Sequence, residues 1–278
     1  KRTMSNSSLA TYSRQPTVNK SNPRTEKISK ITIHHWSGVI ATAKQGVDYF
    51  CSKECMENRQ VSANYVIGND GSIGMMIPEN RRSWCSSSSW NDQRAITVEV
   101  SNSKRGGDWP ISDAAMKSLI KLCADICQRN GIKKLYYDGT KNATLTRHCF
   151  YSNTDCPGTY IKNHTSYICD EVNKLLGVKV SVNTSKTNPY KKPTMVLNSS
   201  NAAYGKKYAG RSEVKWIHYE LQRLRLYSGE ADGYFGPMTV NAVKAFQRTH
   251  KDLNGKQLEA DGSVGPLTRD ALEKAVKE

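Results

Sequence analysis

Long apolar runs are missing from this sequence of 278 residues. A helix that spans a membrane needs about 18 or more consecutive apolar residues, so no membrane span is predicted. The first 20 residues are basic and polar, and they lack the apolar centre of a secretory signal. Cysteine is absent from the carboxy-terminal third, which argues against a small secreted domain whose disulfides are spread evenly.

Acidic residues are scarce, and the stretch 178–210 contains none. The chain has 41 basic and 25 acidic side chains, which gives a formal net charge of +16. Such a charge favours polyanionic partners, namely nucleic acid, anionic lipid or the anionic polymers of a bacterial wall. Because no aromatic–basic RNA motif, zinc-finger spacing or helix-turn-helix pattern is present, we expect no nucleic-acid partner.

The first two thirds of the chain alternate between strand and helix patterns. Residues 1–27 are predicted to form an extended arm. Strands are predicted at 30–36 and 94–102, and an Asn-Asp-Gly turn indicates a β-hairpin within 63–80. Helices are predicted at 43–58, 112–131 and 166–177, with Ser112 as the cap that begins the second and Gly131 as its end. This alternation predicts a mixed α/β layer fold.

The remaining third has a different organisation. The composition of residues 178–210 predicts a basic linker, and residues 212–227 carry the apolar stripe of a helix. The pattern DGxxGPxT then occurs twice, starting at Asp232 and at Asp261, 29 residues later. Each copy predicts a turn followed by a helix with proline near its first position, at 240–250 and 269–278. A compact three-helix module is therefore expected at 211–278.

The eight cysteines divide into groups with different expectations. Cys123 and Cys127 lie in the apolar stripe of the helix at 112–131, which favours reduced core residues over a metal or redox role. Cys51 and Cys55 either form a disulfide or pack separately. Cys156 follows His148 by eight residues and is followed at once by Pro157.

The loop that contains His148 and Cys156 suits a catalytic zinc ion with one open coordination position. A third ligand must come from another segment, and the predicted strand at 30–36 offers two histidines. Side chains alternate along a strand, so His34 faces a cleft if Ile31 and Ile33 face the core. His35 then packs with these isoleucines or supports the site from behind. The alternative is that the three residues are separate side chains with other partners.

Glu99 lies in mid-strand in the sequence AITVEV, opposite the apolar face of that strand. Burying a carboxylate between valines is costly without a compensating role. A catalytic role and a structural salt bridge both explain its presence.

Five motifs occur in order along the chain: ITIHHW, SANYVIGNDGSI, ENRRSW, AITVEVSN and the RH…TDCPG loop. Together they resemble the zinc-dependent N-acetylmuramoyl-L-alanine amidases found among phage lysozyme-amidases and peptidoglycan recognition proteins. The resemblance covers residues 28–177 and implies an α/β mixed-sheet amidase domain with flanking helices. It also implies a zinc site at His34, His148 and Cys156.

The resemblance assigns further roles near the metal. It implies that Glu99 is the catalytic base and that Tyr65, beside the zinc ion, stabilises the oxyanion. Many bacterial and phage members carry a lysine two positions before the last ligand, where this chain has Thr154. This departure leaves the zinc ion, Tyr65 or the Thr154 hydroxyl to stabilise the oxyanion.

The carboxy-terminal module resembles the three-helix peptidoglycan-binding domains, a small all-α fold. Tyr219 and Tyr234 are expected to line a glycan or peptide groove, whereas Phe246 is expected in the core. The two resemblances imply hydrolysis of the amide between N-acetylmuramic acid and L-alanine in peptidoglycan. The alternative is a peptidoglycan recognition protein that binds without cleaving.

The site of action implied by these resemblances is the bacterial cell wall, where anionic wall polymers are additional partners. Such an enzyme is either a phage endolysin made in the host cytoplasm or a secreted autolysin. The polar amino-terminal residues favour the phage interpretation.

Overall fold

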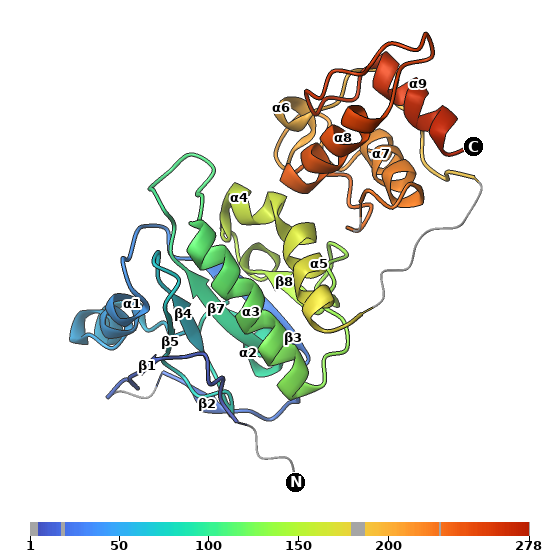
Figure 1. Ribbon diagram of the computed structural model, residues 1–278. Coiled ribbons are helices and arrows are strands. Elements are labelled where there is room, and N and C mark those ends of the chain that lie inside the picture. Colours follow the sequence, from blue (N-terminus) through green and yellow to red (C-terminus); the bar gives the residue numbers. More distant parts are fainter. Residues whose placement is uncertain (1–4, 18–19, 179–186, 228, 278) are drawn as a thin grey trace. The chain divides into compact units, whose positions relative to one another are not determined.

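The computed structural model describes residues 5–17, 20–178, 187–227 and 229–277, and it divides into two compact units (Figure 1). The first unit comprises residues 1–161 and 171–178. The second comprises residues 162–170 and 179–278. The two units are described separately.

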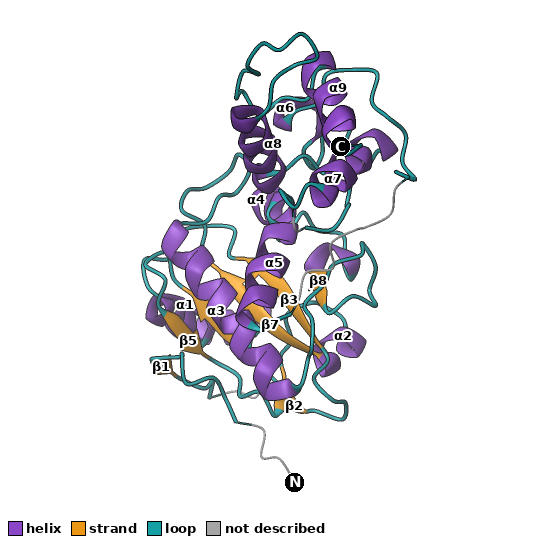
Figure 2. Cartoon of the chain, turned by 45° about the vertical axis from the view of Figure 1, so that its right-hand side comes forward, coloured by secondary structure: helices purple, strands orange, loops and turns teal. Residues whose placement is uncertain are grey.

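A mixed sheet of six strands organises the first unit within the described residues. Its central strands β3 and β7 run side by side in Figure 2. All neighbouring strands are parallel except β4 and β5, which form the predicted hairpin. In spatial order the strands are β1 (Tyr12–Ser13), β5 (Ile73–Met75), β4 (Tyr65–Ile67), β7 (Ala95–Val100), β3 (Lys30–His35) and β8 (Leu145–Arg147).

Helices cover both faces of this sheet. Helix α3 (Asp113–Asn130) begins at Ser112, whose side chain accepts a hydrogen bond from Ala115 N, and ends at Gly131 in the left-handed region, as predicted. Helix α1 (Ala43–Phe50) packs on the other face, where a Cβ at Gly46 would meet Val66. The shorter helices are α2 (Ser89–Arg94), α4 (Gly158–Asn163) and α5 (Thr165–Leu175).

The helix predicted at 43–58 is interrupted. Helix α1 ends at Phe50, and a π-helical turn follows at Cys55–Arg59. Ser52 explains the interruption, because its hydroxyl accepts a hydrogen bond from Cys55 N and so begins a new turn. None of the eight cysteines forms a disulfide in the structure, and Cys51 and Cys55 are both buried.

The extended arm predicted at 1–27 joins the sheet in its described part. Strand β1 pairs with β5, and β2 (Asn22–Pro23) pairs with β6 (Arg81–Arg82). The side chain of Arg24 is half-buried, and its guanidinium donates to the carbonyl oxygens of Glu79, at 2.7 Å, and Ala95, at 2.8 Å. Its burial lowers the pKa of Arg24 to about 10. The arm therefore contributes to the core of the first unit.

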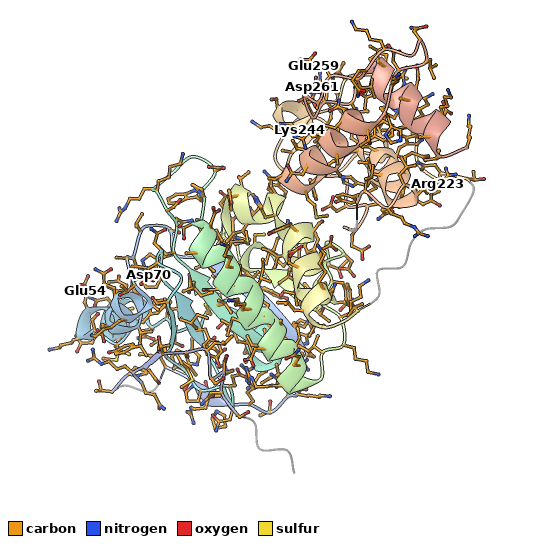
Figure 3. The ribbon with its side chains drawn as sticks, viewed as in Figure 1. Glu54, Asp70, Arg223, Lys244, Glu259 and Asp261 are labelled. Atoms are coloured by element: carbon orange, nitrogen blue, oxygen red, sulfur yellow. The ribbon has the colours of Figure 1, made fainter. Side chains whose placement is uncertain are left out.

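The second unit contains the predicted helices and a core of its own. Asp232 and Asp261 hold equivalent turns, because each side chain accepts a backbone hydrogen bond from the residue two positions later. Figure 3 labels Asp261 at the second of these turns. A helix with proline at its first turn follows each copy, as predicted. The helices are α6 (Ser199–Ala202), α7 (Ser212–Arg223), α8 (Pro237–Thr249) and α9 (Pro266–Ala275).

The structural repeat extends into the preceding helices. His218 on α7 lies 3.0 Å from the Thr239 hydroxyl of the first copy. Gln247 on α8 occupies the corresponding place 29 residues later and donates to the Thr268 hydroxyl at 3.1 Å. Each turn is thus fixed to the helix that precedes it by one buried polar side chain.

The predicted linker is only partly separate from this unit. Residues 179–186 lie outside the described residues, but residues 187–210 pack on the helical core. Leu197 is fully buried and forms a β-bridge with Val264, and Lys192 pairs with Asp270 and Glu273. A polar composition predicted a linker here, but a few buried residues such as Leu197 attach the segment to the helical core. The linker prediction was therefore wrong over 187–210.

The predicted fold class is confirmed: a mixed sheet with flanking helices is joined to a small helical unit. Among the described residues, no helix has the length and apolar character needed to cross a membrane.

Candidate metal centre

Two central strands place His34 and Glu99 on the same face of the sheet. Strands β3 and β7 are parallel, and His34 lies directly opposite Glu99 in their register. Val66 on β4 is the next residue in this row. Because paired residues of parallel strands point to the same side, this row lies on the face that α1 covers.

The loop after β8 brings His148 and Cys156 to this row. Arg147 pairs with Ile33 of β3, so His148 begins its turn beside His34. The backbone N–H of Cys149 donates to the carbonyl oxygen of Cys156 at 3.1 Å and closes the loop. The rings of His34 and His148 are 4.5 Å apart between centroids.

The three predicted ligands offer donor atoms that all lie within 4.8 Å of one another. His34 Nε2 is buried and has no hydrogen-bond partner among the described residues, as expected of an atom that coordinates a metal ion. Burial lowers the pKa of both His34 and His148, which keeps the imidazoles neutral as metal binding requires. The donor set therefore fits zinc.

Neighbouring groups hold two of these ligands in place. The backbone N–H of His35 lies 3.4 Å from Cys156 Sγ and donates to it, which favours the thiolate form. Ser152 Oγ lies 2.9 Å from His148 Nε2, so this contact orients the imidazole and leaves Nδ1 for a metal. The His35 ring packs against Trp109, with 5.0 Å between ring centroids.

Glu99 is half-buried and has little hydrogen bonding. Its Oε1 accepts one weak hydrogen bond from Cys85 Sγ at 3.7 Å, and its buried Oε2 has no partner within the described structure. Burial raises the pKa of the Glu99 carboxyl to about 8. His34, Cys85 and Glu99 also form a second group whose donor atoms lie within 4.8 Å of one another. No salt bridge of Glu99 occurs in the part of the chain that the structure describes.

A cleft of about 660 Å³ opens beside these groups. Thr154 lines it, and its hydroxyl oxygen accepts a hydrogen bond from Cys156 N at 3.2 Å. The hydroxyl proton of Thr154 is thus available to another acceptor. One wall of the cleft is aromatic, formed by Trp36, Tyr49 and Phe50.

Tyr65 is not near this site, which contradicts the role predicted for it. Its register partner on β7 is Val98, so its side chain points to the face opposite Glu99. The ring is fully buried, and its hydroxyl donates to Glu79 Oε1 at 2.6 Å and accepts from Ser7 N at 2.8 Å. The motif was matched by residue type, whereas the sheet register decides which face each residue occupies.

The tyrosines predicted to bind the wall lie in different environments of the second unit. Tyr219 is buried, and its hydroxyl donates to the Thr187 carbonyl at 3.2 Å. Its ring therefore does not line an exposed groove, in contrast to the prediction. Tyr234 is half-buried against Tyr204, with 5.4 Å between ring centroids. Phe246 is fully buried in the core, as expected.

Sequence reasoning missed three residues of the cleft: Cys85, Arg59 and Arg105. None has a local signal, because Cys85 precedes a polar run of serines and the two arginines are ordinary surface cations in a basic chain. Only the fold brings them beside Glu99 and the aromatic wall.

Comparison with known proteins identifies two families in the chain. Residues 24–159 match the N-acetylmuramoyl-L-alanine amidase family, and residues 210–272 match the peptidoglycan binding domain family. The chain is 27% identical to the N-acetylmuramoyl-L-alanine amidase CwlL of Bacillus licheniformis over 88% of this chain and 66% of CwlL. It therefore spans just under two thirds of that relative.

Two other proteins are also similar. CwlA of Bacillus subtilis, an N-acetylmuramoyl-L-alanine amidase, is 28% identical over 81% of this chain and 84% of CwlA. The structure of PlyL aligns with a TM-score of 0.46 and 19% identity over 61% of this chain and 98% of PlyL. The chain thus carries a domain of the N-acetylmuramoyl-L-alanine amidase family, followed by a domain of the peptidoglycan binding family.

Proposed function

We propose that this chain is a zinc-dependent hydrolase that cleaves the amide between N-acetylmuramic acid and L-alanine in bacterial peptidoglycan. The proposal rests on one observation above all: donor atoms of His34, His148 and Cys156 lie within 4.8 Å of one another beside Glu99. The family match of residues 24–159 supports the choice of substrate.

His34, His148 and Cys156 would hold the zinc ion. When bound at such a site, zinc lowers the pKa of a water molecule and polarises a carbonyl group. The remaining chemistry belongs to the side chains of this protein, which orient the substrate and move protons.

Glu99 is the general base of this mechanism. Its carboxylate takes a proton from the attacking water and passes it to the leaving amine of L-alanine. Burial raises the pKa of Glu99 to about 8, although Cys85 and Arg59 lower it slightly, and a cation at the neighbouring ligands would lower it further toward neutrality. A base with such a pKa is well matched to a neutral working pH.

Thr154 is the side chain best placed to stabilise the developing oxyanion. It lines the cleft two residues before Cys156, and its hydroxyl proton is not used by the contact with Cys156 N. Tyr65 is excluded from this role by its position on the opposite face.

The second unit would anchor the enzyme to peptidoglycan and so raise its local concentration at the wall. The family match of residues 210–272 supports this role, and Tyr234 is the candidate contact of the two predicted tyrosines. The net charge of +16 adds attraction to anionic wall polymers, which salt should weaken. We place its action at the bacterial cell wall, as an endolysin or an autolysin.

A recognition protein that binds without cleaving is the second candidate. The complete ligand set, which includes Cys156, favours the enzyme. Mass spectrometry of purified peptidoglycan after digestion separates the two: the enzyme releases peptides with a free L-alanine amino terminus, and Glu99→Gln protein does not. Intact muropeptides after wild-type treatment would contradict the proposal.

A further inference from the structure

The cleft beside the proposed zinc site has an unusual set of charges. Its charged lining residues, apart from the metal ligands, are Glu99 and two arginines, Arg59 and Arg105. Both arginines are exposed, and neither forms an ion pair with any residue that the structure describes. The mouth of the cleft is therefore cationic.

Arg59 is held at the aromatic wall. It comes from the π-helical turn Cys55–Arg59, and its Nη1 donates to the Tyr49 hydroxyl at 3.2 Å. The Tyr49 ring in turn packs edge-on against Trp36, with 5.7 Å between centroids. This contact uses one of the five N–H donors of the guanidinium and leaves the others for a ligand.

Arg105 comes from the loop after β7 and packs over a glycine. A Cβ at Gly38 would lie 3.7 Å from both Nε and Nη2 of Arg105, so this edge of the guanidinium packs against the open backbone there. No hydrogen bond of the Arg105 guanidinium to another described residue is found. A planar cation positioned by packing alone keeps its full set of donors for a bound anion.

Three other arginines of the first unit form ion pairs. Arg14 pairs with Asp48 at 2.9 Å, Arg94 with Glu26 at 3.2 Å, and Arg129 with Glu79 at 2.6 Å. An unpaired cation is common in a chain with 41 basic and 25 acidic residues, so lack of a partner alone decides nothing. The two arginines are distinctive because both line the cleft that contains the candidate metal ligands.

We propose that Arg59 and Arg105 bind carboxylates of the peptide that follows the scissile amide. This inference rests on the proposed function. Guanidinium groups bind carboxylates through paired hydrogen bonds, and they lose this interaction when the carboxylate is converted to an amide. The cleft therefore selects stem peptides with free carboxylates over the same peptides with amidated side groups.

Binding is measured by calorimetry on full-length, zinc-loaded Glu99→Gln protein, which keeps the cleft but turns over slowly. The ligands are two muramyl peptides that differ only in amidation of the peptide carboxylates. We expect the free-carboxylate peptide to bind about tenfold more tightly, which corresponds to about 1.4 kcal/mol. Introducing Arg59→Gln or Arg105→Gln into this protein should reduce the ratio of the two affinities severalfold. The preference for the free-carboxylate peptide should also weaken at high salt.

Lys104→Gln is the matched control, because Lys104 is an exposed cation next to Arg105 that does not line the cleft. It should leave the binding ratio unchanged. Arg105→Lys should retain part of the preference, since it keeps the charge but loses the planar pair of donors. A ratio near one in the parent protein, or an undiminished ratio in the double Arg59→Gln, Arg105→Gln protein, would overturn the inference.

Cleavage is measured in parallel with wild-type protein, so that the two proposals fail in different ways. If wild-type protein cleaves neither peptide, the proposed function fails, while the binding ratio still decides the role of the arginines. If wild-type protein cleaves both peptides equally well and binds them equally, the selectivity fails and the amidase function stands.

Discussion

Two carboxylates on opposite faces of one sheet, one fully buried and one half-buried, have contrasting environments. Glu79 is fully buried and accepts hydrogen bonds from Tyr65, Arg129 and Asn130. Glu99 accepts only a weak bond from Cys85, and its Oε2 has no partner in the described structure. A buried polar group without partners costs stability and persists where it has another use. The contrast therefore separates a structural carboxylate from a candidate catalytic one.

The largest expected effect comes from Glu99→Gln, which removes the base but keeps the shape of the side chain. Turnover of peptidoglycan should fall by about 10²–10⁴, the usual contribution of a general base. Zinc content should be unchanged, because Glu99 is outside the proposed ligand set. Turbidity loss of wall suspensions and metal analysis of the same sample measure both properties. Normal turnover would assign the base to another residue.

Glu79→Gln tests the other side of the comparison. This change leaves the buried part of Arg129 without its main counter-charge, although Asp125 still lies 2.8 Å away. We expect the free energy of unfolding to fall by about 3 kcal/mol. Activity per folded molecule should stay near that of the wild type. Thermal and urea unfolding measure the change in stability. A fall in kcat as large as that of Glu99→Gln protein would show that the two faces of the sheet are coupled.

Tyr65→Phe sharpens the assignment of Tyr65 to the structural face. Removing its hydroxyl deprives Glu79 and Ser7 N of a partner, so we expect a loss of about 1–2 kcal/mol in stability. The kcat should be unaffected. Thr154→Val is the matched variant at the cleft, where kcat rather than stability should fall. A loss of kcat in Tyr65→Phe protein, with normal kcat in Thr154→Val protein, would instead favour Tyr65 as the oxyanion donor.

The last expected effect is a pH dependence of stability in the chelated, metal-free protein. Burial raises the folded pKa of Glu99 to about 8, above its ordinary value of 4.5. Its contribution to stability is therefore fully present below about pH 4.5 and is lost as pH rises through about 8. The stability of Glu99→Gln protein relative to wild type should therefore rise between about pH 4.5 and pH 8. A difference in unfolding free energy that stays constant over this range would contradict the raised pKa.

The sequence was most informative where a local pattern and the fold agree. Alternation along ITIHHW and AITVEV predicted that His34 and Glu99 face away from the apolar side, and the register places them opposite each other. The caps Ser112 and Gly131 were likewise predicted, because capping depends on adjacent residues.

Features set by long-range pairing were not predictable. The face of Tyr65 depends on its pairing with Val98, and no property of its own strand reveals that partner. The packing of 187–210 depends on a few residues such as Leu197, which a polar composition concealed. Cys85 and the cleft arginines approach the site only through the fold, so their positions required the structure.

The zinc content of purified protein tests the central claim most directly. Wild-type protein and the single variants His34→Ala, His148→Ala and Cys156→Ala are dialysed against metal-free buffer and analysed by atomic emission. The account predicts about one zinc ion per wild-type chain and little zinc, with no release of L-alanine amino termini, in each variant. Full zinc retention by the Cys156→Ala protein, or undiminished cleavage by chelated wild-type protein, would contradict the account.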